Sequence, residues 1–126
     1  VKQFFLQDMD RYFWLRLGGI SGAIAVGMGA FGAHGLKKHI SDQKLISAWE
    51  TAAHYQLLHS VVLCLLSFTP KVSPLTGYLL TSGITLFSGS IYLLVLTKLK
   101  FLGPVTPIGG LLLIASWVSL AINTSQ

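Results

Sequence analysis

The sequence predicts an all-α membrane protein, a four-transmembrane-helix bundle with up-down-up-down topology. Of its 126 residues, 52% are apolar and only 10% are charged, where soluble globular proteins have about 25%. Four long, largely apolar stretches are separated by short polar segments, which favours antiparallel neighbours. Seven of the 13 glycines fall between Leu17 and Gly35. Each would destabilise a helix in water by roughly 1 kcal/mol relative to alanine, whereas in a bilayer glycines allow helices to pack closely.

The charges suit a membrane surface. Nine Lys and Arg residues against four Asp and Glu residues give a net charge of +5, and most lie between the apolar stretches or ahead of the first. Such cations favour anionic membrane lipids as partners. No basic stripe is interleaved with exposed aromatic residues, so nucleic acid is not expected as a partner. The single cysteine, Cys64, cannot form an intramolecular disulfide.

The first predicted helix spans about residues 12–34, after an interfacial segment at 1–11 that mixes apolar and charged side chains. Small residues recur along it at intervals of 4, 3, 4 and 3, which keeps them on one face. This face should form a groove for another helix. Gly35 is expected to end the helix in the left-handed conformation. The predicted packing residues of this face are Gly18, Gly22, Ala25, Gly29 and Gly32.

The second predicted helix spans about residues 43–68, with Ser41 or Asp42 as its cap. Its first half is polar, yet crossing a bilayer takes roughly 20 residues, so the polar half must lie within the span. With Glu50 at the interface, His59 lies about 13 Å deeper, close to the middle of the bilayer. The sequence therefore predicts an intramembrane polar cluster, formed by Glu50, His54, Gln56 and His59.

The third and fourth predicted helices span about residues 74–96 and 107–122. Both start signals are a hydroxyl residue followed by proline, Ser73–Pro74 and Thr106–Pro107. The third helix carries a second small-residue face at four-residue spacing, formed by Gly77, Thr81, Thr85 and Gly89. Four spans place both termini on one side of the membrane, and the lysines and arginines of the two sides weakly favour the outer side.

Four blocks of sequence carry a resemblance to a known family. They are GAFGAHGLK at 29–37, WETAAHYQLLH at 49–59, LFSGSIYLL at 86–94, and TPIGG at 106–110 followed by Trp117. Together they resemble the transmembrane protein 256 family, small multi-pass membrane proteins of bacteria and of eukaryotes with mitochondria, whose molecular function is not established. The resemblance implies a four-span protein and lends weight to a mitochondrial or bacterial inner membrane. Of the two, we expect the mitochondrial inner membrane rather than a bacterial plasma membrane. It carries over no catalytic residues.

No enzyme template fits the sequence. It has no Ser-His-Asp arrangement with plausible geometry, no phosphate loop and no paired carboxylates. Gly27, Gly29 and Gly32 have dinucleotide-like spacing but lie in a membrane helix rather than after a strand. We therefore predict a non-catalytic protein without catalytic, cofactor-binding or metal-binding residues.

Three functional hypotheses remain. The first is an accessory subunit of a larger inner-membrane assembly such as a respiratory complex, with other membrane protein subunits as partners, because the small-residue faces exceed what one short bundle needs. The second is a small transporter or proton-path protein that uses the intramembrane His59. The third is a metal or haem carrier, which would need His34, Glu50 and His54 to meet, although no tight ligand motif is present.

Overall fold

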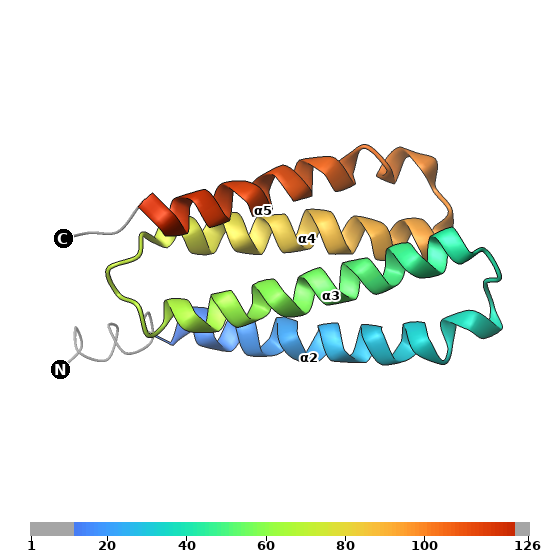
Figure 1. Cartoon of the computed structure of the whole chain (residues 1–126), viewed down its shortest axis with the longest axis horizontal. Helices are drawn as coiled ribbons and strands as arrows, with labels where there is room; N and C mark the ends of the chain where they lie inside the picture. Colours follow the sequence, from blue (N-terminus) through green and yellow to red (C-terminus); the bar gives the residue numbers. More distant parts are fainter. Residues whose placement is uncertain (1–11, 123–126) are drawn as a thin grey trace.

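A computed structural model describes residues 12–122, and the predicted interfacial segment at 1–11 lies outside them. Four helices form the fold: α2 (Phe13–Ala33), α3 (Gln43–Leu66), α4 (Pro74–Thr97) and α5 (Val105–Ile122). Two short 3-10 turns, η1 (Leu36–Lys38) and η2 (Lys100–Leu102), precede α3 and α5. Figure 1 shows η1 and η2 at one end of the bundle and the α3–α4 connection at the other. The prediction of an all-α, up-down-up-down bundle is confirmed.

Three segments of the described chain are long and apolar enough to cross a membrane: Phe13–Lys38, Pro74–Thr97 and Lys100–Ile122. Helix α3 is not among them, because polar side chains occupy its first half. At 24 residues it is nevertheless as long as α4 and runs alongside it. We therefore treat α3 as the polar member of a membrane-embedded bundle.

Two of the predicted start signals cap their helices. The Asp42 carboxylate accepts a hydrogen bond from the Lys44 backbone N–H at 2.9 Å, at the start of α3. The Ser73 hydroxyl accepts one from the Leu75 N–H at 3.2 Å, with Pro74 in the first turn of α4. Each cap satisfies a backbone donor that has no partner within its helix.

Helix α5 begins at Val105, two residues before the predicted start at Pro107. The Thr106 hydroxyl, predicted as the cap, instead forms a hydrogen bond of 2.5 Å with the Ser90 hydroxyl on α4. Pro107 is accommodated inside the first turn because the backbone N–H groups there need no helical partner.

Gly35 does not adopt the predicted left-handed conformation. Its φ is −75°, and α2 ends at Ala33 with His34 as the capping residue. The absence of a side chain at Gly35 serves packing instead, since a Cβ there would lie 2.7 Å from the Phe31 ring. The left-handed helix end is at Lys98, after α4, with φ of 59°.

The bundle consists of two helix pairs, α2 with α3 and α4 with α5, joined by the packing of α3 against α4. Two clusters of buried apolar side chains make the core. The cluster nearer η1 is formed by Leu36, Ile46, Trp49, Ala52, Ile91, Tyr92 and Val95. The cluster nearer the α3–α4 connection is formed by Val62, Leu63, Leu66, Leu80, Ile84 and Leu113.

Candidate functional site

Gln56 ties three helices together at the centre of the bundle. Its side chain is 6% exposed. The amide nitrogen donates to the Ser21 backbone carbonyl of α2 at 3.1 Å and contacts the Ser21 hydroxyl at 3.3 Å. The amide oxygen accepts a hydrogen bond of 2.7 Å from the Tyr92 hydroxyl of α4. A buried amide with both ends satisfied fixes the relative placement of its partners.

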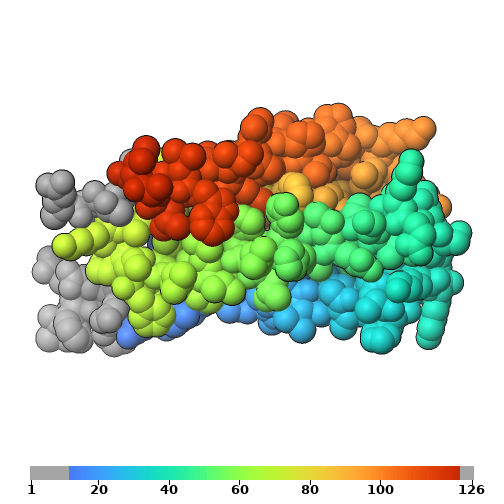
Figure 2. Space-filling view, viewed as in Figure 1, coloured from blue at the N-terminus to red at the C-terminus, as the bar shows by residue number. Residues whose placement is uncertain are grey.

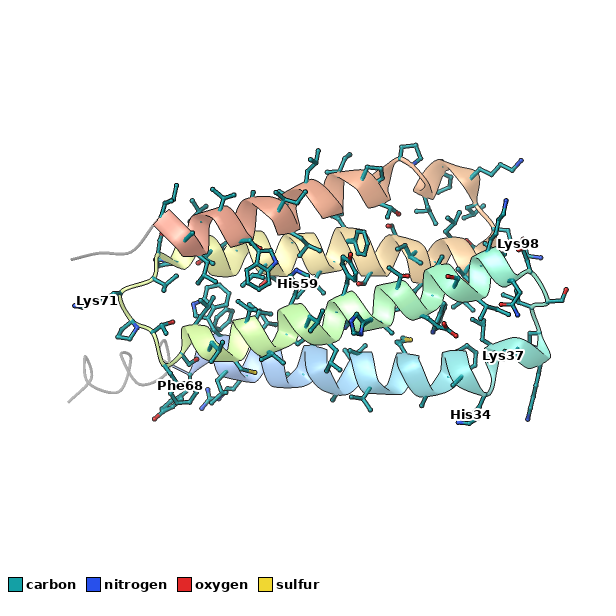
Figure 3. All side chains as sticks on the ribbon, viewed as in Figure 1. His34, Lys37, His59, Phe68, Lys71 and Lys98 are labelled. Carbon is teal, nitrogen blue, oxygen red and sulfur yellow. The ribbon has the colours of Figure 1, made fainter. Side chains whose placement is uncertain are left out.

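His59 joins α3 to α5. Its imidazole is 5% exposed, with Nδ1 2.6 Å from the Tyr55 carbonyl oxygen and Nε2 3.0 Å from the Trp117 indole nitrogen. An indole N–H can only donate, so Nε2 accepts, and Nδ1 therefore carries the proton that is donated to the carbonyl. These partners assign a neutral imidazole. Figure 3 shows His59 between α3 and the two later helices.

The other two residues of the predicted polar cluster lie outside the bundle. Glu50 and His54 are exposed on the outer face of α3, and neither has a hydrogen-bond or ion-pair partner among the described residues. The structure therefore divides the four residues into a buried pair, Gln56 and His59, and an exposed pair.

The residues required for a metal or haem carrier do not converge. His34 lies at the end of α2 and points away from α3 in Figure 3. Within residues 12–122 no group of three His, Cys, Asp or Glu side chains is placed to hold a metal ion. The hypothesis of a site built from His34, Glu50 and His54 is therefore wrong for the described part of the chain.

Several glycines sit where a neighbouring helix leaves no room for a side chain. A Cβ at Gly18 would lie 2.7 Å from the Cys64 sulfur, and one at Gly32 would lie 2.6 Å from the Trp49 ring. Ala25, between them on α2, is 3% exposed. On α4, Gly77 is covered by the Trp14 ring of α2. These positions hold the bundle together by close backbone approach.

Other small residues of the predicted faces have open space in front of them. A Cβ added at Gly29 or Gly89 would have no neighbouring atom within 4 Å, and one at Gly22 would meet only Ser60 at 3.8 Å. Thr81 and Thr85 donate their hydroxyls to carbonyls of their own helix, at 2.8 Å each. Unlike Gly18 and Gly32, these residues therefore do not form close helix–helix contacts within the bundle.

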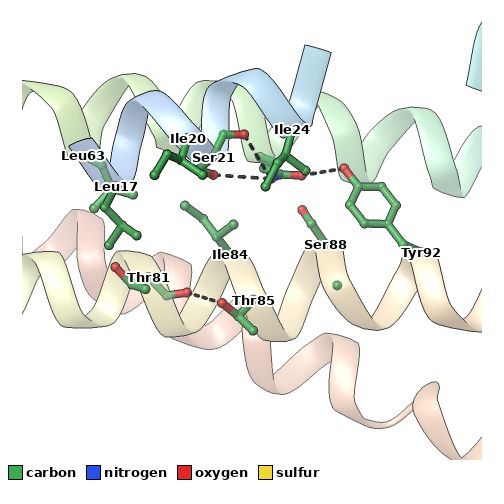
Figure 4. Close-up of a pocket in the computed structure, with 12 residues that line it drawn as sticks. Leu17, Ile20, Ser21, Ile24, Leu63, Thr81, Ile84, Thr85, Ser88 and Tyr92 are labelled. Carbon is green, nitrogen blue, oxygen red and sulfur yellow. Dashed lines mark hydrogen bonds between the residues drawn. The ribbon is translucent and has the colours of Figure 1, made fainter. Parts of the chain in front are cut away.

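Two grooves run along the bundle. The first, of about 300 Å³, separates α2 from α4 and is lined mainly by apolar side chains and hydroxyls (Figure 4). Ile20 and Ile24 of α2 face Thr81 and Thr85 of α4 across it, and Gln56 is among its lining residues. The second, of about 480 Å³, lies between α3 and α5, and Tyr55, His59 and Phe87 line it.

Sequence reasoning missed Trp117 as the partner of His59 and Ser21 as the partner of Gln56. A signal was present for the first, because a tryptophan N–H on an apolar membrane helix needs an acceptor that the lipid cannot supply. No signal was present for the second, since serines occur on all four predicted helices.

Comparisons with known proteins give a consistent result. A family model described as "Protein of unknown function (DUF423)" matches residues 28–110. A UPF0382 membrane protein of Staphylococcus aureus (strain bovine RF122 / ET3-1) is 46% identical over 112 residues, covering 86% of this chain and 91% of the relative. The UPF0382 membrane protein YwdK of Bacillus subtilis is 41% identical over 112 residues, covering 84% of this chain and 90% of the relative.

A eukaryotic relative extends the comparison. The UPF0382 membrane protein C1782.12c of Schizosaccharomyces pombe is 40% identical over 110 residues, covering 82% of this chain and 93% of the relative. No solved structure matches the chain. The similarity covers nearly the whole bundle and supports an integral membrane protein.

Proposed function

We propose that this chain, which belongs to the DUF423 (UPF0382) family of membrane proteins, is a non-catalytic structural subunit that packs against other membrane proteins. Within that role we propose an accessory subunit of a larger inner-membrane assembly such as a respiratory complex. One observation carries the proposal: α2 presents a face of small residues to the outside of the bundle, and no side chain of residues 12–122 covers it.

The open face of α2 is formed by Gly19, Ala23, Gly27 and Ala30, all exposed and spaced by 4, 4 and 3 residues. A Cβ at Gly19 or Gly27 would meet no atom within 4 Å. Glycine lowers helix stability by about 1 kcal/mol relative to alanine, and here no internal contact offsets that loss. Small residues at four-residue spacing allow two membrane helices to approach closely. A helix of another subunit on this face would supply the missing contact.

The proposed membrane is the mitochondrial inner membrane in preference to a bacterial plasma membrane. The support is the resemblance to the transmembrane protein 256 family, together with a relative in the eukaryote Schizosaccharomyces pombe. Other relatives come from the bacteria Staphylococcus and Bacillus.

Lysines at the η1 and η2 end of the bundle would favour anionic lipid head groups. They are Lys37, Lys38, Lys98 and Lys100.

The open face of α2 provides the first test. In mild detergent, we expect the chain to co-purify with other membrane proteins, and the double substitution Gly19→Leu with Gly27→Leu to reduce their recovery at least tenfold. The helical circular dichroism should be unchanged, because both positions have room for a side chain. The measurement is quantitative mass spectrometry of the purified complex.

Gly89→Leu is the matched control, since Gly89 also has open space but faces the groove between α2 and α4. We expect it to leave the recovery of partners unchanged. A monodisperse monomer without co-purifying proteins would contradict the proposed function. Loss of partners in Gly89→Leu alone would contradict the assignment to the α2 face.

The alternative function, a small transporter or proton-path protein, rests on His59, which lines the groove between α3 and α5. If His59 carries a proton, His59→Ala should abolish a pH-dependent flux in proteoliposomes while the bundle stays folded. The hydrogen bonds favour the structural role, because protonating Nε2 would remove the acceptor of the Trp117 N–H. We therefore expect equal flux in the wild type and the variant, and a loss of flux would favour the transporter.

A further inference from the structure

We propose that two copies of this chain associate along the outer face of α3, with Glu50 of each copy facing His54 of the other. The inference goes beyond the proposed function, since it concerns another helix and a second copy rather than a different protein. The contact surface, which we call the α3 seam, is formed by exposed residues at a spacing of three or four. They are Ser47, Glu50, Thr51, His54, Leu57, Leu58 and Val61.

The described residues leave the α3 seam uncovered along its length. Leu57, Leu58 and Val61 are 40 to 53% exposed. Figure 2 shows α3, coloured cyan to yellow-green, at the surface between α2 and α5. Positions 47, 50, 54, 57 and 61 repeat with the period of seven that lets two parallel helices keep one line of contact. A neighbouring parallel helix therefore fits the seam.

The polar half of the seam extends from the start of α3 toward the middle of the bundle. Glu50 is about 10 Å and His54 about 16 Å along the helix from Gln43, at 1.5 Å per residue. We take Lys44 and the lysines of η1 as the head-group level at this end, which places Glu50 inside the bilayer rather than at the interface, where the sequence alone places it. Glu50 is the only acidic residue in any of the four described helices. Ionisable side chains at such depth normally face a polar partner rather than lipid.

Neither polar side chain of the seam is satisfied by the part of the chain that the structure describes. Among the described residues, Glu50 and His54 have no hydrogen-bond or ion-pair partner. Gln56 and His59, on the opposite side of the same helix, have partners at both ends of their polar groups. Since the inner polar side chains of α3 are fully paired, the unpaired outer ones point to a partner outside the chain.

The acid and the base on one face favour a second copy as that partner. Copies inserted with the same orientation meet about a two-fold axis along the membrane normal, which brings equal depths together and makes the two α3 helices parallel. In such an interface residue i contacts residue j, and j contacts i. Glu50 of each copy then lies level with Glu50 of the other and enters a space bordered on one side by His54 of the second copy, so each acid has a base of the other copy beside it. Small side chains at Ser47 and Thr51 allow close approach.

Cysteine cross-linking tests the contact directly. The single native cysteine permits a Cys64→Ala background, into which Ser47→Cys or Ile108→Cys is introduced in the full chain in liposomes. Ile108 is 53% exposed near the same end of the bundle, but on α5. We expect oxidation to link Ser47→Cys into a dimer and to leave Ile108→Cys monomeric. No dimer with Ser47→Cys, or equal dimer with Ile108→Cys, would overturn the proposal.

The charge pair is tested by energy transfer between labelled copies in liposomes at several protein-to-lipid ratios. We expect Glu50→Leu or His54→Leu to weaken dimerisation at least tenfold. The exchange of Glu50→His with His54→Glu should restore it, because the pairing is symmetric. Neither position has a partner within residues 12–122, so the fold should persist.

Unchanged dimerisation in Glu50→Leu, or failure of the exchange variant to restore it, would overturn the proposal. The result is separable from the proposed function, because Gly19→Leu with Gly27→Leu should leave Ser47→Cys cross-linking intact. Cross-linking of Ser47→Cys in native membranes to a different protein, instead of to its own copy, would also overturn it.

Discussion

Gly109→Ala is expected to lower the free energy of unfolding by about 3 kcal/mol, because it places a methyl group inside the backbone of the neighbouring helix. A Cβ at Gly109 would overlap the Phe87 backbone nitrogen and lie 2.6 Å from the Leu86 carbonyl carbon and 2.7 Å from the Phe87 Cα. Backbone atoms cannot rotate away as a flexible side chain can. The substitution must therefore push α5 away from α4 along a close contact. Reversible unfolding in mixed micelles measures the loss.

Gly110→Ala is the matched control for this prediction. The nearest atom to a Cβ there is the Phe87 Cδ1 at 3.6 Å, an ordinary van der Waals contact. Both substitutions change glycine to alanine in the same turn, so they share the gain in helix propensity, and their difference reports the contact alone. We expect Gly110→Ala to be at least as stable as the wild type. Equal stability of the two variants would contradict the α4–α5 packing described above.

The positions of the helices were predictable because local chemistry determines them. Asp42 caps α3 and Ser73 with Pro74 starts α4, and each acts through backbone atoms within two residues. The start of α5 was predicted two residues late, because the Thr106 hydroxyl bonds Ser90, 16 residues away on α4. A cap signal is dependable only when no distant partner competes for its side chain.

The tightest glycine contact could not be predicted. Periodicity shows which small residues share a face of one helix, but it does not show how far each helix is rotated toward its neighbour. Gly109 was absent from the predicted packing faces, although its contact is closer than that of Gly18 or Gly32. Conversely, Gly29 and Gly89 have the expected spacing but open space in front of them.

The division of the α3 polar residues into a buried pair and an exposed pair could have been predicted from the sequence. At about 100° per residue, Glu50 and His54 lie within about 40° of each other, whereas Gln56 and His59 point to the opposite side of the helix. A single cluster of the four was therefore geometrically inconsistent. The partners Tyr92 and Trp117 could not be inferred in this way, since they lie 36 and 58 residues further along the chain.

Trp49→Ala is expected to lower the free energy of unfolding by about 4 kcal/mol, as large-to-small substitutions at buried aromatic residues do. The ring is 1% exposed, donates to the Met28 carbonyl at 2.7 Å and lies 4.7 Å from the Tyr92 ring between centroids. In a bilayer the loss is mainly van der Waals contact. The indole lies directly over Gly32, which has no side chain to move into the space, so the cavity should persist.

Trp117→Ala removes the same side chain at a position that is 48% exposed, and it is the matched control for Trp49→Ala. Its expected cost, measured by the same unfolding in mixed micelles, is about 2 kcal/mol, since it mainly leaves the His59 Nε2 acceptor without its donor. Equal losses in the two variants would mean that Trp49 is not the contact that holds α2 to α3. The inner side of α2 would then be as available to a partner as its outer face. Glycines packed against α3, such as Gly18 and Gly32, could then no longer be distinguished from glycines with open space, such as Gly19 and Gly27.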